Sequence, residues 1–244
     1  MSNSNPKILL AIPTYHCEKQ IKRVISELNS ECLNHLTEII ILDNQSSDQT
    51  IEVAKETFES LNISKFKIFY NEENLGLGGS QKKAFQYAID NEFEHIIILH
   101  GDNQAISSEL MLLVEEAIQH NEYACVLGSR FSLNSKRINY SRVRTFGNLC
   151  FNALYSLFTR RLIADLGSGL NLFSVRLLKK IDFNACSNAF TFNMDLILKI
   201  ISTKEKIKYI PITWREFDQV SNARNLNVGI QTLKALYNWM KNKK

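Results

Sequence analysis

Short apolar runs alternate with amphipathic stretches along the first half of the chain. The runs predict strands at Lys7–Ile12, Glu38–Leu42, Phe66–Tyr70, His95–Leu99 and Ala124–Leu127. Between them, apolar residues at helical spacing predict helices over residues 21–28, 50–61, 79–91 and 108–120. Strands that are apolar on both faces and separated by helices are typical of a parallel sheet covered on both sides. The pattern therefore predicts an α/β fold with a mostly parallel central sheet and helices on both faces.

The pattern changes after Gly128. Residues 130–144 are polar and basic and are interpreted as a loop. The next stretch, 143–159, has helical spacing and carries Phe146, Leu149, Cys150, Ala153, Leu154 and Leu157 on one side. Shorter helices are predicted at 174–181 and 192–201, a late strand at 207–212 and a basic amphipathic helix at 225–244. The first half has the pattern of a nucleotide-binding layer, and the second half that of the part that shapes a substrate.

Composition excludes several classes of protein. Hydrophobic residues make up 45% and charged residues 22% of 244 residues, as in soluble globular proteins. The net charge of +4 is too mild to predict a nucleic-acid partner, but it suits a local pocket for anionic phosphates. Five dispersed cysteines without a CxxC pair predict free thiols rather than disulfides or a zinc site. The N-terminus lacks the features of a signal peptide and no apolar stretch is long enough to span a bilayer, so we expect a cytoplasmic protein.

Polar side chains follow the predicted strands, where ligands bind in open parallel sheets. Asp43 ends the second strand and can accept hydrogen bonds from a nucleobase or ribose, although a turn or capping role is the more ordinary interpretation of this residue alone. Asp102 follows the fourth strand, with Gln104 two residues on. Its carboxylate can hold Mg²⁺ or Mn²⁺ against a diphosphate, because such cations complete their shell with phosphate oxygens and water. The alternative is another turn-forming Asp.

A glycine-rich loop follows the third strand. Gly76, Gly78 and Gly79 would let backbone N–H groups approach phosphates, and Lys82 at the start of the next helix can face the same phosphates. The match to a dinucleotide-binding fingerprint is loose, because Gln81 stands at the third glycine position. A tight turn and a solvated lysine are equally compatible with this stretch.

The second half carries a basic loop and an isolated carboxylate. Arg130 and Arg144 belong to a run of arginines that forms either a solvated loop or a clamp for phosphate oxygens. Asp195 lies beside an apolar helix face, as a base or an acceptor ligand would. A partner for Arg215 is the alternative role.

Taken in order, these stretches resemble glycosyltransferase family 2, in particular its polyprenyl-phosphate (dolichol-phosphate) sugar synthase-like branch. The resemblance runs from Ile8 to about Ser221. It is carried by AIPTYHCEKQI, ILDNQSSDQT, NLGLGGSQKKAFQYA, LHGDNQ, GSR, DLGSGLNLF, FTFNMD and IPITWRE. It implies a GT-A fold in a single domain over residues 1–244, with a nucleotide-sugar-binding half over about 1–128, an acceptor half over about 129–224 and the C-terminal helix 225–244.

The resemblance also assigns roles to residues. Nucleotide-sugar binding is expected of Pro13, Tyr15, Glu18, Asp43, Gly78, Lys82, Asp102, Gln104 and Arg130. The acceptor and sugar pocket is expected to include Arg144, Ser168, Gly169, Arg215 and Ser221. Asp102 is the expected metal ligand, and Asp102 and Asp195 are the expected catalytic residues.

The sequence departs from the family pattern at several positions. His100 replaces the first Asp of the D-x-D motif, so the metal would depend on Asp102 alone. His16 and Cys17 stand where Asn and Glu are common, which makes Glu18 the less certain nucleotide contact. Leu170 and Asn171 replace the usual aromatic and basic residues after Ser-Gly, so sugar or acceptor specificity is expected to differ.

The implied reaction is an inverting transfer of a sugar from a UDP-, GDP- or dTDP-linked donor, with Mg²⁺ or Mn²⁺, in polysaccharide or glycolipid biosynthesis. The arginine-rich loop favours a polyprenyl phosphate acceptor, whereas Asp195 permits a glycan hydroxyl. The 149–158 region or the C-terminal helix can rest on the inner face of a membrane as a peripheral contact; burial in the core and a dimer contact are the alternatives. A nucleotide-sugar-binding protein without turnover and a sugar nucleotidyltransferase are the rival functions.

Overall fold

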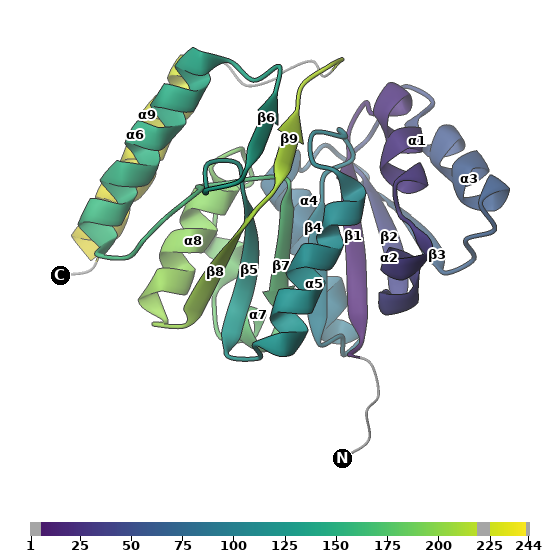
Figure 1. The fold of residues 1–244 in the computed structure, drawn as a ribbon, viewed down its shortest axis with the longest axis horizontal. Coiled ribbons are helices and arrows are strands. Elements are labelled where there is room, and N and C mark those ends of the chain that lie inside the picture. Colours follow the sequence, from purple (N-terminus) through teal and green to yellow (C-terminus); the bar gives the residue numbers. More distant parts are fainter. Residues whose placement is uncertain (1–5, 219–224, 243–244) are drawn as a thin grey trace.

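A computed structural model describes residues 6–218 and 225–242 and shows a seven-stranded sheet in the order β3-β2-β1-β4-β7-β5-β8 (Figure 1). All neighbouring strands are parallel except β7, which is antiparallel to β4 and β5. The strands are β1 (Ile8–Thr14), β2 (Glu38–Asp43), β3 (Phe66–Tyr70), β4 (His95–Leu99), β5 (Tyr123–Ser129), β7 (Leu170–Ser174) and β8 (Lys206–Pro211). The predicted α/β class with a mostly parallel sheet is therefore confirmed.

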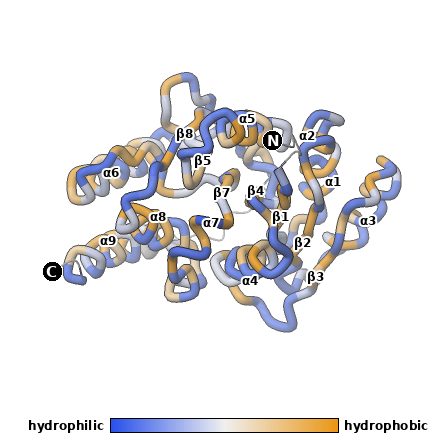
Figure 2. Tube along the Cα trace, turned by 90° about the horizontal axis from the view of Figure 1, so that it is seen from below, coloured by the Kyte–Doolittle hydropathy of each residue, from blue (hydrophilic) through white to orange (hydrophobic). Residues whose placement is uncertain are grey.

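Helices cover both faces of this sheet, as Figure 2 shows from below. One face carries α1 (Glu18–Ser26), α2 (Ser30–His35), α3 (Thr50–Ser60) and α5 (Leu110–Gln119). The other carries α4 (Gly76–Asp90), α7 (Val175–Leu178) and α8 (Phe192–Ser202). Successive residues of β1 alternate between the two cores, with Leu10 in one and Leu9 in the other. Because both faces are covered, the inner strands β1, β2 and β4 are apolar at consecutive positions rather than at alternate ones.

The antiparallel strand β7 brings the second half of the chain to the carboxyl ends of the parallel strands. Its first residue, Leu170, pairs with Leu99 at the end of β4. The backbone N–H of His100 donates to the carbonyl of Gly169 at 2.9 Å, and the N–H of Gly101 donates to the carbonyl of Pro13 at 3.0 Å. Segments far apart in the sequence therefore meet at one edge of the sheet.

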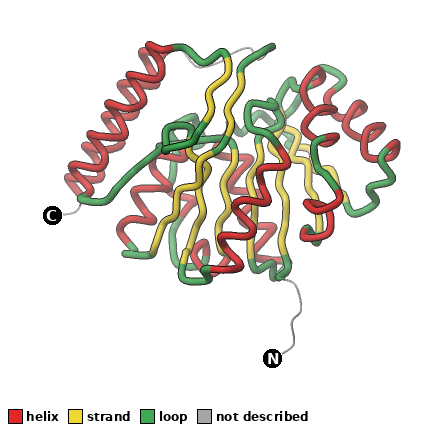
Figure 3. Tube along the Cα trace, viewed as in Figure 1, coloured by secondary structure: helices red, strands yellow, loops and turns green. Residues whose placement is uncertain are grey.

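The basic stretch 130–144 is not wholly a loop. It contains β6 (Lys136–Ile138), which pairs with β9 (Thr213–Arg215) in a small parallel sheet above the main one (Figure 3), and it reaches the start of α6 (Arg142–Thr159). Two short 3-10 turns, η1 (Ser107–Glu109) and η2 (Phe183–Ala185), complete the connections. The pairing of β6 with β9 joins segments about 75 residues apart, which local spacing cannot reveal.

Helices α6 and α9 (Asn225–Asn242) lie side by side beyond β8, at the left of Figure 1. The hydroxyl of Tyr155 on α6 donates to the carbonyl of Thr232 on α9 at 2.7 Å. Over residues 6–218 and 225–242, no helix combines the length and apolar character that crossing a membrane requires.

Candidate active site

The loop after β4 lies directly on the end of β1. Thr14 ends β1 in register with Asp43, the last residue of β2. A Cβ atom on Gly101 would come within 2.6 Å of the Thr14 side chain, so only glycine permits this approach. The loop therefore holds Asp102 beside the ends of β1 and β2.

Asp43 is buried, with 4% of its surface exposed. Its Oδ2 accepts a hydrogen bond from the N–H of Ser46 at 3.1 Å, which turns the chain after β2. Its Oδ1 is buried and has no hydrogen-bond donor within the described structure. Because a buried acceptor without a donor is costly, this oxygen suits a ligand that brings an N–H or O–H group.

Asp102 is held at its oxygen Oδ1 by the N–H of Gln104, at 3.1 Å. Burial raises the pKa of Asp102, and the nearby Glu216 carboxylate adds to this effect, while His100 opposes it. The charges of Asp102 and Asp43 both affect the pKa of one common neighbour, Cys17.

Burial is the main reason that the pKa of Cys17 is raised to about 12, and the charges of Asp102, Asp48 and Asp43 contribute. The two predicted carboxylates are thus brought together around a buried, unreactive thiol.

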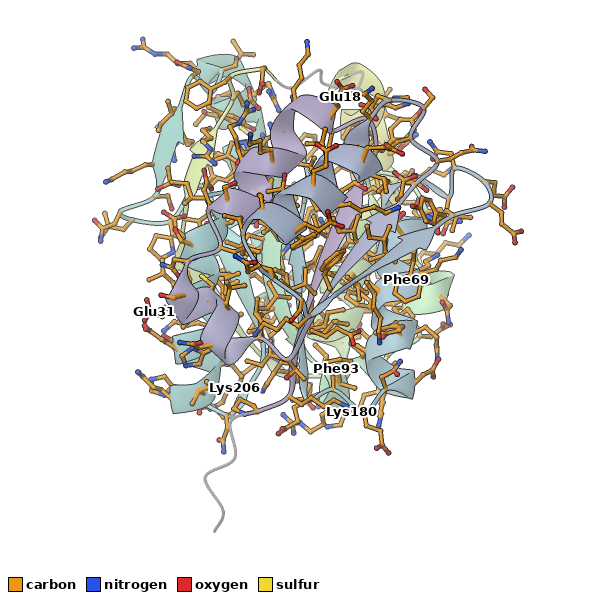
Figure 4. All side chains as sticks on the ribbon, turned by 90° about the vertical axis from the view of Figure 1, so that its right-hand side faces the viewer. Glu18, Glu31, Phe69, Phe93, Lys180 and Lys206 are labelled. Atoms are coloured by element: carbon orange, nitrogen blue, oxygen red, sulfur yellow. The ribbon has the colours of Figure 1, made fainter. Side chains whose placement is uncertain are left out.

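Glu18 connects the first turns of α1 and α3. Its N–H donates to Asp48 Oδ2 at 3.3 Å, and its Oε2 accepts from the N–H of Gln49 at 3.4 Å. Figure 4 shows Glu18 near the carboxyl edge, far from Phe93 and Lys180 at the opposite edge. The structure gives Glu18 a capping role, and its contact with a nucleotide stays a prediction.

Tyr15 presents an aromatic ring at the end of β1. The residue is 39% exposed, and its ring stacks on His16 with 4.1 Å between centroids. His16 is in turn held by its N–H to the Ser46 hydroxyl at 3.0 Å. A fixed, exposed ring beside Asp43 is suited to stacking on a nucleobase.

His100 lies against the start of β7. A Cβ atom on Gly169 would stand 2.9 Å from its Nδ1. Burial lowers the pKa of His100, so the imidazole is neutral near pH 7, and its Nε2 has no hydrogen-bond partner within the described structure. Ser168, also at this edge, is 2% exposed and donates its hydroxyl to the carbonyl of Leu170 at 3.1 Å. Ser168 and Gly169 therefore shape the wall beside His100.

Arg130 is used inside the protein. Its Nε and Nη2 donate to the two carboxylate oxygens of Asp165 at 2.8 and 2.7 Å, and the backbone N–H of Arg130 donates to Asp165 as well. The guanidinium also lies 5.0 Å from the ring of Trp214. Nε and Nη2 are thus engaged by the Asp165 carboxylate, and a contact of Arg130 with phosphate stays a prediction.

Lys82 and Gly78 form hydrogen bonds within the protein, and their contact with a phosphate stays a prediction. The ammonium of Lys82 donates to the carbonyls of Asn184 and Cys186 and to the side chain of Asn188, at 2.9, 2.5 and 2.6 Å. Three acceptors match the three N–H groups of a lysine. The N–H of Gly78 donates to the carbonyl of Asn188 at 2.8 Å. The glycine loop thus fastens α4 to the segment before α8.

Replacing Gly78 with alanine should destabilise the protein by about 1–3 kcal/mol, because the new methyl group overlaps the carbonyl of Ser187 and lies 2.8 Å from Phe192 Cβ. Gly147 on α6 is the matched control, since a Cβ there meets nothing within 4 Å. Gly147→Ala should be stabilising by about 0.5–1 kcal/mol. Urea unfolding of both variants checks this, and equal midpoints would contradict the packing role of Gly78.

A charged network surrounds Asp102 from the small sheet. Glu216 accepts from Arg144 Nη1 at 2.8 Å with both oxygens and from Gln104 Nε2 at 3.1 Å. Arg144 and Gln104 were predicted from the sequence, whereas Glu216 was not, because its only sequence signal is its place directly after TWR. Arg144 and Gln104 are thus brought to the site through Glu216.

Two further expectations concern charged residues of the second half. Arg215 pairs with Glu27 at 2.5 Å and also binds Asn103. The alternative that Arg215 pairs with Asp195 is therefore wrong. Asp195 lies in the first turn of α8 and accepts from the N–H of Ser187 at 2.9 Å, and its charge acts on Tyr155 and Cys186. Its role as a base stays a prediction, and Ser221 lies outside the described residues.

The residues at this edge fit a divalent cation that shares its shell with a ligand. Within the described residues, no group of three His, Cys, Asp or Glu side chains could hold a metal by themselves. Asp102 supplies a carboxylate oxygen, which such cations prefer, and its charge is disfavoured by burial. A cation would offset that cost. The donor set therefore suits Mg²⁺ or Mn²⁺ bound jointly with phosphate oxygens.

Known proteins resemble this chain over nearly its whole length. The UDP-N-acetylglucosamine–dolichyl-phosphate N-acetylglucosaminyltransferase of Methanococcus voltae is 26% identical over 91% of the chain and 91% of its own length. The dolichyl-phosphate beta-glucosyltransferase of Saccharomyces cerevisiae is 24% identical over 86% of the chain and 67% of its own length. Both are named as dolichyl-phosphate glycosyltransferases, in agreement with the resemblance to the dolichol-phosphate branch.

Solved structures share the fold. Glucosyl-3-phosphoglycerate synthase of Mycobacterium tuberculosis, solved with Mn²⁺, uridine diphosphate and phosphoglyceric acid, superposes with a TM-score of 0.73. The match covers 96% of this chain and 78% of that one at 14% identity, and it confirms the expected GT-A fold. The family model of glycosyl transferase family 2 matches residues 10–182, well over half of the chain. The chain therefore belongs to glycosyl transferase family 2 and is a glycosyltransferase.

Proposed function

We propose that this protein transfers a sugar from a nucleoside diphosphate sugar to a polyprenyl phosphate, with inversion at the anomeric carbon. The observation that carries the proposal is the position of Asp43 and Asp102 after β2 and β4, the two strands that flank β1, where the buried Oδ1 of Asp43 lacks a donor. The names of the two dolichyl-phosphate relatives support the acceptor class.

The donor would occupy the carboxyl edge of the sheet. Asp43 Oδ1 would accept a hydrogen bond from the nucleoside, and the exposed ring of Tyr15 would stack on the base. Pro13 would complete this wall. Asp102 would hold a divalent cation, which supplies positive charge to the leaving diphosphate. These residues orient the donor so that its anomeric carbon faces the second half of the chain.

The transfer forms one bond and breaks one. An oxygen of the acceptor phosphate attacks the anomeric carbon, the bond from that carbon to the diphosphate breaks, and the electron pair leaves with the nucleoside diphosphate. A phosphate is ionised near neutral pH, so it needs no general base. Arg144, beside Glu216 and partly exposed, supplies positive charge for the acceptor phosphate. The engagement of Asp195 with Ser187 agrees with a reaction that does not require this carboxylate as a base.

A polyprenyl acceptor resides in a membrane, so the protein would act as a peripheral protein at the inner face. The division into a nucleotide-sugar half over about 1–128 and an acceptor half over about 129–224 follows from the same proposal. It is supported by the positions of Asp43 and Asp102 in the first part and of Arg144 and Ser168 in the second.

Donor binding should raise the melting temperature of the purified protein. A panel of UDP-, GDP- and dTDP-sugars with Mn²⁺ or Mg²⁺ should contain one donor that stabilises by ~2.7 kcal/mol at a hundredfold excess over its dissociation constant. For a chain of this size that is a shift of about 5–10 °C. UDP-sugars are the first choice, because the name of the Methanococcus relative includes one.

The stabilising donor should then be tested with a short-chain polyprenyl phosphate, and mass spectrometry should detect the sugar phosphodiester. Binding without any transfer would favour a binding protein. Release of pyrophosphate from a nucleoside triphosphate and a sugar phosphate would favour a nucleotidyltransferase. Either result would overturn the proposal.

A further inference from the structure

Helix α6 packs on the protein with a mixed side, on which Phe151 and Leu154 lie half-buried against the core beside buried residues that carry polar groups. Asn152, Tyr155 and Thr159 are buried and hydrogen-bonded. The amide of Asn152 donates to the carbonyl of Ala164 at 2.8 Å, and the hydroxyl of Thr159 donates to the backbone carbonyl of Tyr155 at 2.7 Å. Tyr155 reaches α9, as described above. The helix therefore buries only part of its apolar surface, whereas a surface helix usually buries its whole apolar face.

The apolar side of α6 faces outward. Val143 is 81% exposed, and Phe146 and Leu157 are each 71% exposed. Their spacing places them on one face of the helix. With their exposed neighbours they form a continuous band, here called the α6 stripe, made of Val143, Phe146, Leu149, Cys150, Ala153 and Leu157. A contiguous exposed apolar band of this kind marks an interaction surface.

Helix α9 exposes an apolar row of its own. Ile230, Leu233 and Tyr237 are exposed at helical spacing, whereas Thr232 and Leu236 are buried. The two helices lie next to each other in Figures 1 and 2 and are joined by a hydrogen bond. The apolar surface of this side of the molecule is therefore shared by two helices.

The charged side chains of helices α6 and α9 are all positive. Neither helix contains an Asp or a Glu, and exposed basic residues accompany both apolar rows: Arg142 and Arg160 at the ends of α6, and Lys234 and Lys241 on α9. Exposed apolar residues flanked by basic ones are typical of helices that lie in the interface of an anionic bilayer. A two-fold contact between copies would instead place these cations opposite themselves, without carboxylates from either helix.

We propose that the α6 stripe and the apolar row of α9 dock the protein on an anionic phospholipid bilayer. The inference rests on the proposed function in one respect: docking on a bilayer would bring the protein to an acceptor that resides there. It also explains why the first turn of α6 is tied to the site: Arg144 binds Glu216, which binds Gln104, whose N–H holds Asp102. Docking by α6 would bring the acceptor side of the site to the lipid surface.

Flotation with vesicles tests the docking. The full chain should float with vesicles that contain phosphatidylglycerol, and raised salt should weaken the binding, because the attraction of exposed charges is screened. The double variant Phe146→Ser/Leu157→Ser should bind at least tenfold more weakly. The matched control is Leu112→Ser/Ile118→Ser on α5, where both residues are also exposed, and it should bind as the unmodified protein does. Equal binding by both double variants, or no flotation, would overturn the proposal.

Cys150 allows a direct measurement of depth. It is the exposed member of the five cysteines, so an environment-sensitive fluorophore attached under native conditions reports on the α6 stripe. Anionic vesicles should shift its emission to the blue, and brominated acyl chains should quench it. A blue shift that depends on protein concentration without vesicles, with no quenching by brominated lipid, would show a contact between copies and contradict docking.

Failure of docking can be told apart from failure of the proposed function. A water-soluble short-chain polyprenyl phosphate needs no membrane. Transfer to this acceptor by a protein that does not bind vesicles would reject the docking and keep the reaction. Vesicle binding without any transfer would reject the reaction and keep the docking.

Discussion

Replacing Asp102 with asparagine is expected to lower kcat/KM by about 10³-fold, which corresponds to about 4 kcal/mol of transition-state stabilisation. The amide keeps the oxygen that accepts from Gln104 but removes the charge that would hold a divalent cation. Isothermal titration calorimetry should show that Mn²⁺ no longer strengthens the binding of the nucleoside diphosphate. Asp90→Asn, at the exposed end of α4, is the matched control and should behave as the unmodified protein. Metal-dependent binding that persists in Asp102→Asn would remove Asp102 from the metal site.

The same variant should be more stable than the unmodified protein when metal is chelated. Burial raises the pKa of Asp102 in the folded state above its unfolded value. The folded state therefore disfavours the charged form of Asp102. The contribution of the neutral carboxyl to the free energy of unfolding is present at low pH and is lost as the pH rises through the folded pKa. Removing the charge should raise the melting temperature at pH 7 in EDTA. A lower melting temperature would show that the charge is compensated by contacts that the amide cannot replace.

Replacing Asp165 with alanine is expected to destabilise the fold by about 3–5 kcal/mol, because Arg130 is left buried without its counter-ion. Only 10% of the Arg130 side chain and 1% of the Asp165 side chain are exposed. Asp165 also accepts from the N–H of Gly167 at 3.0 Å, so its loss would loosen the segment that leads to Ser168. Urea unfolding followed by circular dichroism gives the free energy.

The double variant Arg130→Met/Asp165→Leu is the informative control. It removes both charges and restores apolar volume, so it should recover much of the lost stability. If the double variant were as unstable as Asp165→Ala, the cost would lie in the lost backbone hydrogen bonds rather than in the unpaired charge. If Asp165→Ala were nearly neutral, the buried Arg130–Asp165 pair would not stabilise the fold.

The central sheet could be predicted because its strands carry their own signal. The ranges predicted for β3 and β4 match the structure, and β1, β2 and β5 differ only at their ends. Strand β7 was missed, since LNLFS is short and follows a turn, and its antiparallel place between β4 and β5 is set by partners distant in sequence. The short helix α2 was missed for want of an apolar period.

The carboxylates of the site could be selected because each follows an apolar strand, and parallel strands end at one edge. The partners of the positively charged side chains could not be predicted from the sequence. Arg130 meets Asp165 within the second half, 35 residues further along the chain, and Lys82 meets Asn188 through the folding of the second half onto the first. A basic residue near a phosphate motif has the same sequence signal whether its charge is offered to a ligand or used internally.

Which face of α6 is exposed could also not be predicted from the sequence. Helical spacing placed Phe146, Leu149 and Leu157 on one face, as the structure has them, but spacing does not say what that face meets. Burial in the core was one alternative for the region 149–158. Leu154 packs against the core as that alternative holds, whereas Leu149 and Leu157 are exposed. The buried polar residues Asn152 and Tyr155 find partners in Ala164 and Thr232, which only the structure reveals.

A crystal structure of the protein with Mn²⁺ and the donor that stabilises it most would test directly whether Asp43 and Asp102 bind the nucleotide sugar. The account predicts a nucleoside hydrogen-bonded to Asp43 Oδ1 and an Asp102 oxygen about 2 Å from a cation that also binds the diphosphate. A nucleotide bound elsewhere on the sheet, or one that leaves Asp43 and Asp102 without contact, would contradict it.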